Sequence, residues 1–144
     1  MDEWLRRYAG QNRRRDTAAT WVIADADNIV VAYASLSMTG IDRSGAPELL
    51  AKGSPDPVPA LLIGRLAVDR SYAGLGVGTA LVAHLLATAV ELNATAACRA
   101  VVVTALDPAA RVWWERFGFQ PLEPGGLDLY LFTAEIEATL RRLR

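Results

Sequence analysis

The sequence feature that most constrains the fold is a glycine-rich segment, residues 73–79, which separates two apolar segments. The segment before it, residues 61–68, is short and almost continuously apolar, which is typical of a strand buried on both faces. In the segment after it, residues 81–90, apolar side chains recur with helical spacing. A buried strand, a tight turn and an amphipathic helix in this order predict an α/β fold.

Three alternating glycines, Gly74, Gly76 and Gly78, give this segment a possible chemical role. Glycine lets the backbone approach a ligand closely, and the start of a helix attracts anions through its N–H groups and its dipole. The segment therefore predicts a diphosphate cradle, although such turns also occur without a ligand. A Rossmann fingerprint would need GxGxxG and a Walker loop would need Gly-Lys-Ser/Thr, and neither pattern is present.

The first half of the chain also predicts a hairpin and a long loop. Residues 20–24 and 29–36 are rich in β-branched and aromatic side chains and flank an Asp/Asn-rich turn, so they predict two antiparallel strands. Asp25 and Asp27 then belong to the turn rather than to a metal site. Residues 40–59 contain many glycines and prolines and predict a loop of about twenty residues, a length usually found in functional or disordered segments.

The second half predicts two further strands and two helices. Residues 100–106 predict a second buried strand, followed by a helix that Asp107 caps and Gly118 ends. Residues 127–133 predict the last strand, and residues 134–144 a C-terminal helix. The order of elements predicts a mixed α/β domain around one sheet.

Length and composition exclude several classes of protein. A chain of 144 residues predicts one domain, residues 1–144, and a formal net charge of −1 provides no overall attraction to nucleic acid or membranes. Cys98 is the only cysteine and His84 the only histidine, so neither an internal disulfide nor a metal site is expected. The sequence has neither an apolar stretch of about eighteen residues nor a secretory leader, so we expect a cytoplasmic protein without a membrane span.

A cluster of arginines lies in a basic amphipathic helix predicted over residues 3–15. Its members are Arg6, Arg7, Arg13, Arg14 and Arg15. The cluster is either a solvated helix face or a surface that contacts the phosphates of a nucleic acid.

Three short segments carry a more specific resemblance. They are Arg65-Leu66-Ala67-Val68-Asp69, Tyr72-Ala73-Gly74-Leu75-Gly76-Val77-Gly78-Thr79-Ala80-Leu81 and Trp114-Glu115-Arg116-Phe117-Gly118-Phe119. In order and spacing they resemble the GNAT superfamily of N-acetyltransferases, over roughly residues 20–133. Within that superfamily the chain is most similar to the toxins of GNAT/ribbon–helix–helix toxin–antitoxin pairs, which acetylate the amino acid on charged tRNA.

The resemblance implies the GNAT fold, an α/β fold with a mixed sheet. The family's first strand has no room after Met1, so we expect either that the chain is shortened or that its true start lies upstream. It also implies acetyl-CoA as cofactor and direct transfer of the acetyl group to an amine, without a covalent enzyme intermediate. The residues that it assigns to the cofactor are Leu66, Ala67, Val68, Ala73, Gly74, Leu75, Gly76, Val77, Gly78, Thr79, Asp107 and Ala110.

The same resemblance implies the acceptor and the partners. The acceptor would be the α-amine of an aminoacyl-tRNA, whose phosphates the N-terminal arginines would contact. A ribbon–helix–helix antitoxin is expected as protein partner, and the family also contains homodimers.

The chain departs from the family pattern at three side chains. Ala73 and Leu75 stand where relatives carry polar or basic residues, and each loss would remove a charged hydrogen bond of the order of 1–3 kcal/mol. Trp114 stands at the position of the tyrosine that protonates the departing thiolate in GNAT toxins. An indole N–H donates a hydrogen bond but does not release its proton, so we expect Trp114 to be a weaker catalytic residue. Tyr72 and Tyr130 are the candidates to replace the missing acid.

These departures leave two alternatives to a tRNA-acetylating toxin. One is a catalytically weakened scaffold that binds acetyl-CoA and a protein partner, and the other is an acetyltransferase for a small amine or peptide. Of the two adjacent tryptophans, Trp113 is expected in the core and Trp114 at a cleft, because neighbours on a helix cannot face the same side. His84 is expected at the surface and Cys98 in the interior.

Overall fold

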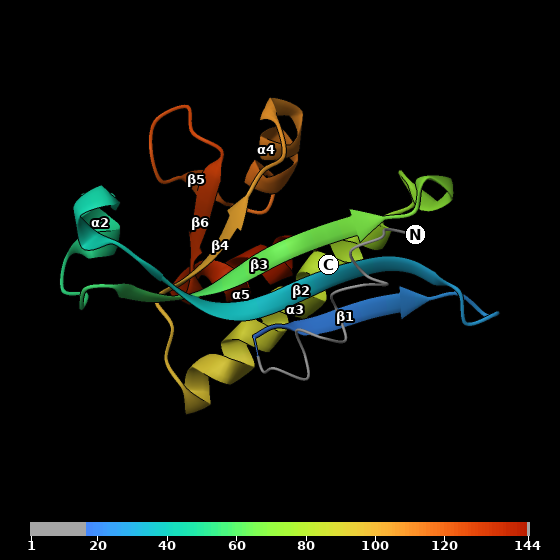
Figure 1. The fold of residues 1–144 in the computed structure, drawn as a ribbon, viewed down its shortest axis with the longest axis horizontal. Helices are drawn as coiled ribbons and strands as arrows, with labels where there is room; N and C mark the ends of the chain where they lie inside the picture. The colour runs from blue at the N-terminus through green and yellow to red at the C-terminus, as the bar shows by residue number, and fades with distance from the viewer. Residues whose placement is uncertain (1–16, 144) are drawn as a thin grey trace. The chain divides into compact units, whose positions relative to one another are not determined.

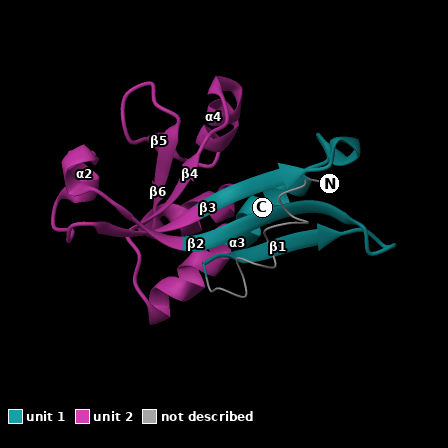
Figure 2. Ribbon diagram, in the orientation of Figure 1, with its two compact units in different colours: residues 1–37, 63–85 teal, residues 38–62, 86–144 magenta. Residues whose placement is uncertain are grey.

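The computed structural model of the protein describes residues 17–143 (Figure 1). These residues form two compact units (Figure 2), the first made of residues 17–37 and 63–85 and the second of residues 38–62 and 86–143. The predicted helix over residues 3–15 and its five arginines lie outside the described residues. The strands follow the order β1-β2-β3-β4-β6-β5, which confirms the predicted mixed α/β fold.

The predicted hairpin is present in the first unit. Strand β1 (Ala19–Ala24) pairs antiparallel with the first part of β2 (Val30–Ile41), with Trp21 opposite Ala34. The Asp25 carboxylate accepts hydrogen bonds from the backbone N–H groups of Asp27, at 2.9 Å, and Ile29, at 3.0 Å. These bonds confirm that the two aspartates belong to the turn.

The first unit also contains the predicted strand–turn–helix. Strand β3 (Val58–Val68), whose last six residues belong to this unit, is followed by a short 3-10 helix, η3 (Arg70–Tyr72). Helix α3 (Val77–Thr95) comes next, and its first nine residues belong to this unit. The backbone N–H of Asp69 donates to the carbonyl of Val31 at 2.7 Å, which ties the end of β3 to β2. Leu81, Val82 and Leu85 lie on the buried face of α3, as the periodicity predicts.

Helix α3 is also the one helix, among residues 17–143, that is long and apolar enough by length and composition to cross a membrane. It has 19 residues and a mean hydropathy of 1.4 over its most apolar window. Its Leu81, Val82, Leu85 and Leu86 are buried within the protein, which is typical of a core helix.

The second unit contains three antiparallel strands. β4 (Ala100–Thr104) pairs with β6 (Asp128–Phe132), and the short β5 (Gln120–Pro121) pairs with the other side of β6. In the register of β4 and β6, Val102 is paired with Tyr130. Alternate residues of each strand point to opposite faces of the sheet, so these two side chains share one face. One side belongs to a core cluster of buried residues that consists of Ile41, Leu50, Val58, Ala60, Ala100, Val102 and Tyr130.

The predicted loop over residues 40–59 is wrong in extent and in content. Strand β2 continues to Ile41, β3 begins at Val58, and the connection holds a 3-10 helix, η2 (Arg43–Gly45), and a short helix, α2 (Glu48–Ala51). The fully buried side chain of Leu50 explains the difference, because it anchors α2 in the core cluster. The prolines and glycines end the strands, but Leu50 between them is still buried, whereas its neighbour Leu49 is 73% exposed.

Two helices complete the second unit. Helix α4 (Pro108–Glu115) begins after the predicted cap, Asp107. The chain reverses at Gly118, whose φ of 95° is a conformation that glycine adopts more easily than other residues. After the 3-10 helix η4 (Thr133–Glu135), helix α5 (Ile136–Leu143) contacts the segment that follows α4. The buried hydroxyl of Thr139 donates to the carbonyl of Phe117 at 2.9 Å.

Candidate functional site

The glycine-rich segment forms an open turn at the start of α3. Gly74 and Gly76 have φ values of +78° and +80°, a left-handed conformation that L side chains rarely adopt. A Cβ added to either glycine would meet no heavy atom of residues 17–143 within 4 Å, so both face open space in the described part of the chain. The bond from the N–H of Ala80 to the carbonyl of Gly76 opens the helix, and the N–H groups before Ala80 have no acceptor within it. An anion would therefore meet exposed backbone donors and the positive end of the helix dipole.

The turn is held in place by Asp69, a residue at the end of β3. Its carboxylate accepts hydrogen bonds from the side-chain hydroxyl of Ser71, at 2.6 Å, and from the backbone N–H of Ser71, at 2.9 Å. These two bonds lower the pKa of Asp69 below its usual value. Asp69 therefore stays ionised at neutral pH and fixes the backbone that leads into the glycines.

The residues that the resemblance assigns to the cofactor in this unit have uncharged side chains. Leu66, Ala67 and Val68 are half-buried at the end of β3, and the Leu75 side chain is 69% exposed at the tip of the turn. Ala73 is exposed and offers only a methyl group. The structure thus brings the residues predicted at 66–68 and 73–79 together in one unit, as a site made mainly of backbone.

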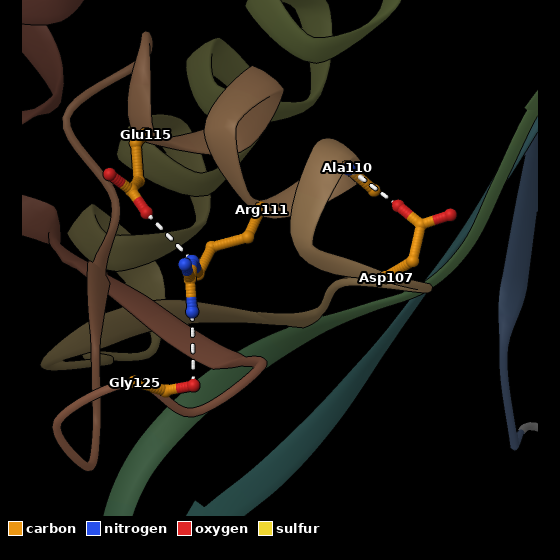
Figure 3. A network of polar contacts seen from close by, with 5 residues as sticks. All are labelled: Asp107, Ala110, Arg111, Glu115 and Gly125. Atoms are coloured by element: carbon orange, nitrogen blue, oxygen red, sulfur yellow. Dashed lines mark hydrogen bonds and ion pairs between the residues drawn. The ribbon is translucent and has the colours of Figure 1, made fainter.

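Asp107 and Ala110, the other two residues assigned to the cofactor, lie in the second unit and bond to each other. The carboxylate of Asp107 accepts a hydrogen bond from the backbone N–H of Ala110 at 2.8 Å (Figure 3). This is an ordinary N-cap bond, and it occupies the Ala110 amide. Ala110 could therefore contact a ligand only through its methyl group or its carbonyl.

Trp114 lies in an aromatic cluster at the end of α4. Its ring centroid is 5.0 Å from that of Trp113, 5.3 Å from Phe119 and 6.2 Å from Phe117. Within residues 17–143 no atom accepts a hydrogen bond from the Trp114 indole, so its N–H is available as a donor. The cluster fixes the ring and leaves its polar atom unused by the described part of the fold.

The expectation for the two tryptophans is wrong, because Trp114 is buried and Trp113 only half-buried. Phe117 follows both at helical spacing, three and four residues later, so the spacing could not choose between them. Phe119 decides the outcome, because it follows the reversal at Gly118 and packs against Trp114.

Neither tyrosine stands out as a substitute acid. The Tyr130 hydroxyl donates to Gln120 Oε1 at 3.4 Å, and burial, helped by the nearby Glu135, raises the pKa of Tyr130. A raised pKa makes this phenol a weaker acid than a free tyrosine. Tyr72 is a half-buried residue of η3, in the first unit.

Two further predictions about single residues are confirmed. The side chain of His84 is exposed, and its ring meets the edge of Trp21 with centroids 4.8 Å apart. Cys98 is buried, as expected for a small apolar residue.

Sequence reasoning missed Arg111, which joins α4 to the loop between β5 and β6 (Figure 3). Its guanidinium donates to the carbonyl of Gly125 at 2.9 Å and lies 3.2 Å from the carboxylate of Glu115. The spacing of Arg111 and Glu115 could have indicated a helical ion pair. No local pattern points to Gly125, which follows Arg111 by 14 residues.

Comparisons with known proteins agree with the architecture. The model of the acetyltransferase (GNAT) family matches residues 1–119. A tRNA-acetylating toxin of Mycobacterium tuberculosis is 30% identical over 140 residues, which cover 97% of this chain and 84% of the toxin. The structure of AtaT complexed with acetyl-methionyl-tRNAfMet is 25% identical, with a TM-score of 0.84, and the match covers 94% of this chain and 82% of AtaT. A mutant AtaT toxin bound to the C-terminus of the antitoxin AtaR and to acetyl-CoA is 26% identical, with a TM-score of 0.78, and the match covers 94% and 80% of the two chains.

Proposed function

The chain belongs to the GNAT family of acetyltransferases, and we propose that it is a toxin that transfers the acetyl group of acetyl-CoA to the α-amine of an aminoacyl-tRNA. The observation that carries this proposal is the relative named as a tRNA-acetylating toxin, which is 30% identical across 97% of this chain. The match extends over 84% of that relative, so it is not confined to a cofactor-binding core shared by many acetyltransferases.

The open glycine turn supports acetyl-CoA as the cofactor. The space around Gly74 and Gly76 admits a bulky ligand against the backbone, and the start of α3 favours its diphosphate. We assign the diphosphate to residues 73–79 and the pantetheine arm to the backbone of Leu66, Ala67 and Val68. Asp107 and Ala110, in the second unit, are assigned to the same cofactor from the family resemblance.

Trp114 is our candidate for the residue that assists the leaving group. Acetyl-CoA supplies an activated thioester, and direct attack by an amine needs no nucleophile from the chain. The Trp114 indole would donate a hydrogen bond to the negative charge that develops on the sulfur as the carbon–sulfur bond breaks. The indole keeps its own proton at neutral pH, so water would protonate the thiolate and would accept the proton that the attacking amine loses when the amide bond forms.

The partners follow from the same proposal. Arg6, Arg7, Arg13, Arg14 and Arg15 would contact tRNA phosphates, which predicts that tRNA binding weakens steeply as salt is raised. Reversing the charges of Arg13, Arg14 and Arg15 should abolish most of that salt dependence. An antitoxin as partner is supported by the AtaT toxin bound to the C-terminus of the antitoxin AtaR. That the antitoxin is of the ribbon–helix–helix type, that the chain forms a homodimer and that it is cytoplasmic belong to the same proposal.

The decisive experiment is transfer of labelled acetyl groups from acetyl-CoA to a mixed pool of charged tRNAs, with the Trp114→Tyr variant in parallel. Labelling by the wild type supports the toxin. Labelling only by the variant favours a scaffold weakened at Trp114, the alternative that the missing acid itself suggests. If neither labels tRNA but the wild type labels small amines or peptides, the tRNA proposal is overturned.

A further inference from the structure

Arg111 connects two parts of the second unit through the two sides of its guanidinium. Its Nε lies 3.2 Å from Glu115 Oε1, one turn later on α4, and its Nη1 donates to the carbonyl of Gly125 at 2.9 Å (Figure 3). The side chains of Arg111 and Glu115 are 26% and 44% exposed, so the pair is partly shielded from water. The rigid planar fork of arginine suits two partners held at fixed positions.

The ion pair with Glu115 does not by itself explain this arrangement. An arginine that precedes a glutamate by four residues is the less favourable order for a helix, because both charges oppose the helix dipole. The geometry instead turns the guanidinium so that Nη1 reaches Gly125. The pair therefore serves the contact with the loop more than the stability of α4.

The contact holds the tip of the loop over residues 122–127. The base of this loop is tied by backbone bonds from Leu122 to Asp128, at 2.8 Å, and from Ala105 to Leu127, at 2.8 Å. At the tip, the N–H of Gly126 donates to the carbonyl of Glu123 at 2.9 Å, which forms a tight turn. Among the described residues, Arg111 provides the only side-chain hydrogen bond to this turn.

The hydrogen bond between Arg111 and Gly125 joins the two ends of the segment 111–125, which contains the whole aromatic cluster. Trp113, Trp114, Phe117 and Phe119 all lie between the two bonded residues. Closing this path restricts the relative positions of α4 and of the segment that carries Phe119. Releasing Gly125 would free α4, which carries the Trp114 ring, to shift against Phe119, because the pairing of β5 with β6 still holds the segment next to Phe119.

We propose that Arg111 is a positioning residue that locks the 122–127 loop onto α4 and thereby fixes the Trp114 ring and its indole N–H. Its effect on the rate rests on the proposed function, because only there does Trp114 act on the leaving group. Its effect on the Trp114 ring does not depend on that function.

The first test measures position without activity. Arg111→Ala and Arg111→Lys are compared with Arg116→Ala, a matched control that removes the same charge from an exposed residue just after α4. We expect both Arg111 variants to shift or broaden the Trp114 indole N–H resonance and to speed hydrogen exchange at the Gly126 amide about tenfold, because lysine lacks the fork. Spectra of Arg111→Ala that coincide with those of Arg116→Ala and the wild type would overturn the proposal.

The second test is a double-mutant cycle on acetyl transfer with Arg111→Ala and Trp114→Phe. We expect Arg111→Ala to lower kcat about tenfold at unchanged KM for acetyl-CoA, and the double variant to be no slower than Trp114→Phe alone. Losses that multiply would show that Arg111 does not act through Trp114. A wild type without acetyl transfer would overturn the proposed function and leave the first test to decide the role of Arg111.

Discussion

The rings of Trp114 and Phe119 meet edge to face, with centroids 5.3 Å apart and planes at 72°. The two residues lie on either side of the reversal at Gly118, so the chain folds back to cover the indole. This contact leaves Trp114 7% exposed and makes its ring a fixed part of the second unit. Because the ring is fixed, the indole N–H of Trp114 points in one direction only.

Trp114→Tyr is expected to raise the rate of acetyl transfer at least tenfold, because a positioned general acid contributes about 10²–10⁴-fold. The smaller ring should also leave a gap in the cluster and cost about 1–2 kcal/mol of the free energy of unfolding. Single-turnover transfer and urea unfolding measure the two effects. The control is Trp113→Tyr, on the half-buried neighbour, which should lower stability less and leave the rate unchanged. Equal rates for the two variants would show that a hydroxyl at position 114 does not act as a general acid.

Gly76→Ala is expected to weaken acetyl-CoA binding at least tenfold. The φ of +80° costs an alanine about 1–2 kcal/mol, and its methyl group would occupy the space assigned to the diphosphate. Gly53→Ala is the matched control, because Gly53 has a φ of +73° and an added Cβ there would also meet no heavy atom of the described residues within 4 Å. Calorimetric titration with acetyl-CoA should show normal affinity for Gly53→Ala despite a similar loss of stability. Normal affinity in both variants would argue against the cradle.

Asp107→Ala is expected to destabilise the protein by about 1 kcal/mol, because it removes the bond that caps α4 at the Ala110 amide. Asp107→Asn keeps an acceptor at the same place and should lose only a few tenths of that amount. Urea unfolding at neutral pH measures both variants. If the asparagine variant is as unstable as the alanine variant, the carboxylate has a role other than capping.

Alkaline pH should destabilise the fold through Tyr130. Burial, and then Glu135, raise the pKa of Tyr130 in the folded protein, so the unfolded chain loses the phenol proton first. The stabilising contribution is therefore complete below the usual tyrosine pKa of about 10 and is lost as the pH rises through the folded value. We expect the urea concentration at the unfolding midpoint to decrease as the pH is raised from about 9 to about 11, a range around the tyrosine pKa. The midpoint of Tyr130→Phe should decrease less over the same range. Glu135→Gln removes the second cause and should give an intermediate slope, and identical slopes for all three proteins would contradict the assignment.

Features that depend on neighbouring residues could be predicted from the sequence. The turn at Asp25, the cap at Asp107 and the reversal at Gly118 each follow from the conformation or hydrogen bond that one side chain favours. The glycine turn belongs to the same class, since Gly74 and Gly76 adopt the positive φ values that only glycine adopts easily.

Features that depend on distant contacts could not be predicted in this way. Whether Trp113 or Trp114 is buried depends on Phe119, and the extent of the 40–59 segment depends on Leu50 entering the core cluster. Both features depend on which surfaces come into contact when the chain folds. Helical spacing and glycine content do not predict these contacts.

The sequence alone determined the class of fold, the glycine turn at the start of α3 and the resemblance to the GNAT family, because each is encoded in short segments of fixed spacing. Only the tertiary structure decided that Trp114 is held in an aromatic cluster and that Arg111 bonds to Gly125. The physical reason is that the cluster forms when α4 packs against Phe119, before β5, and the bond forms when α4 meets the loop after β5. The energy of each contact belongs to a pair of surfaces and not to either segment.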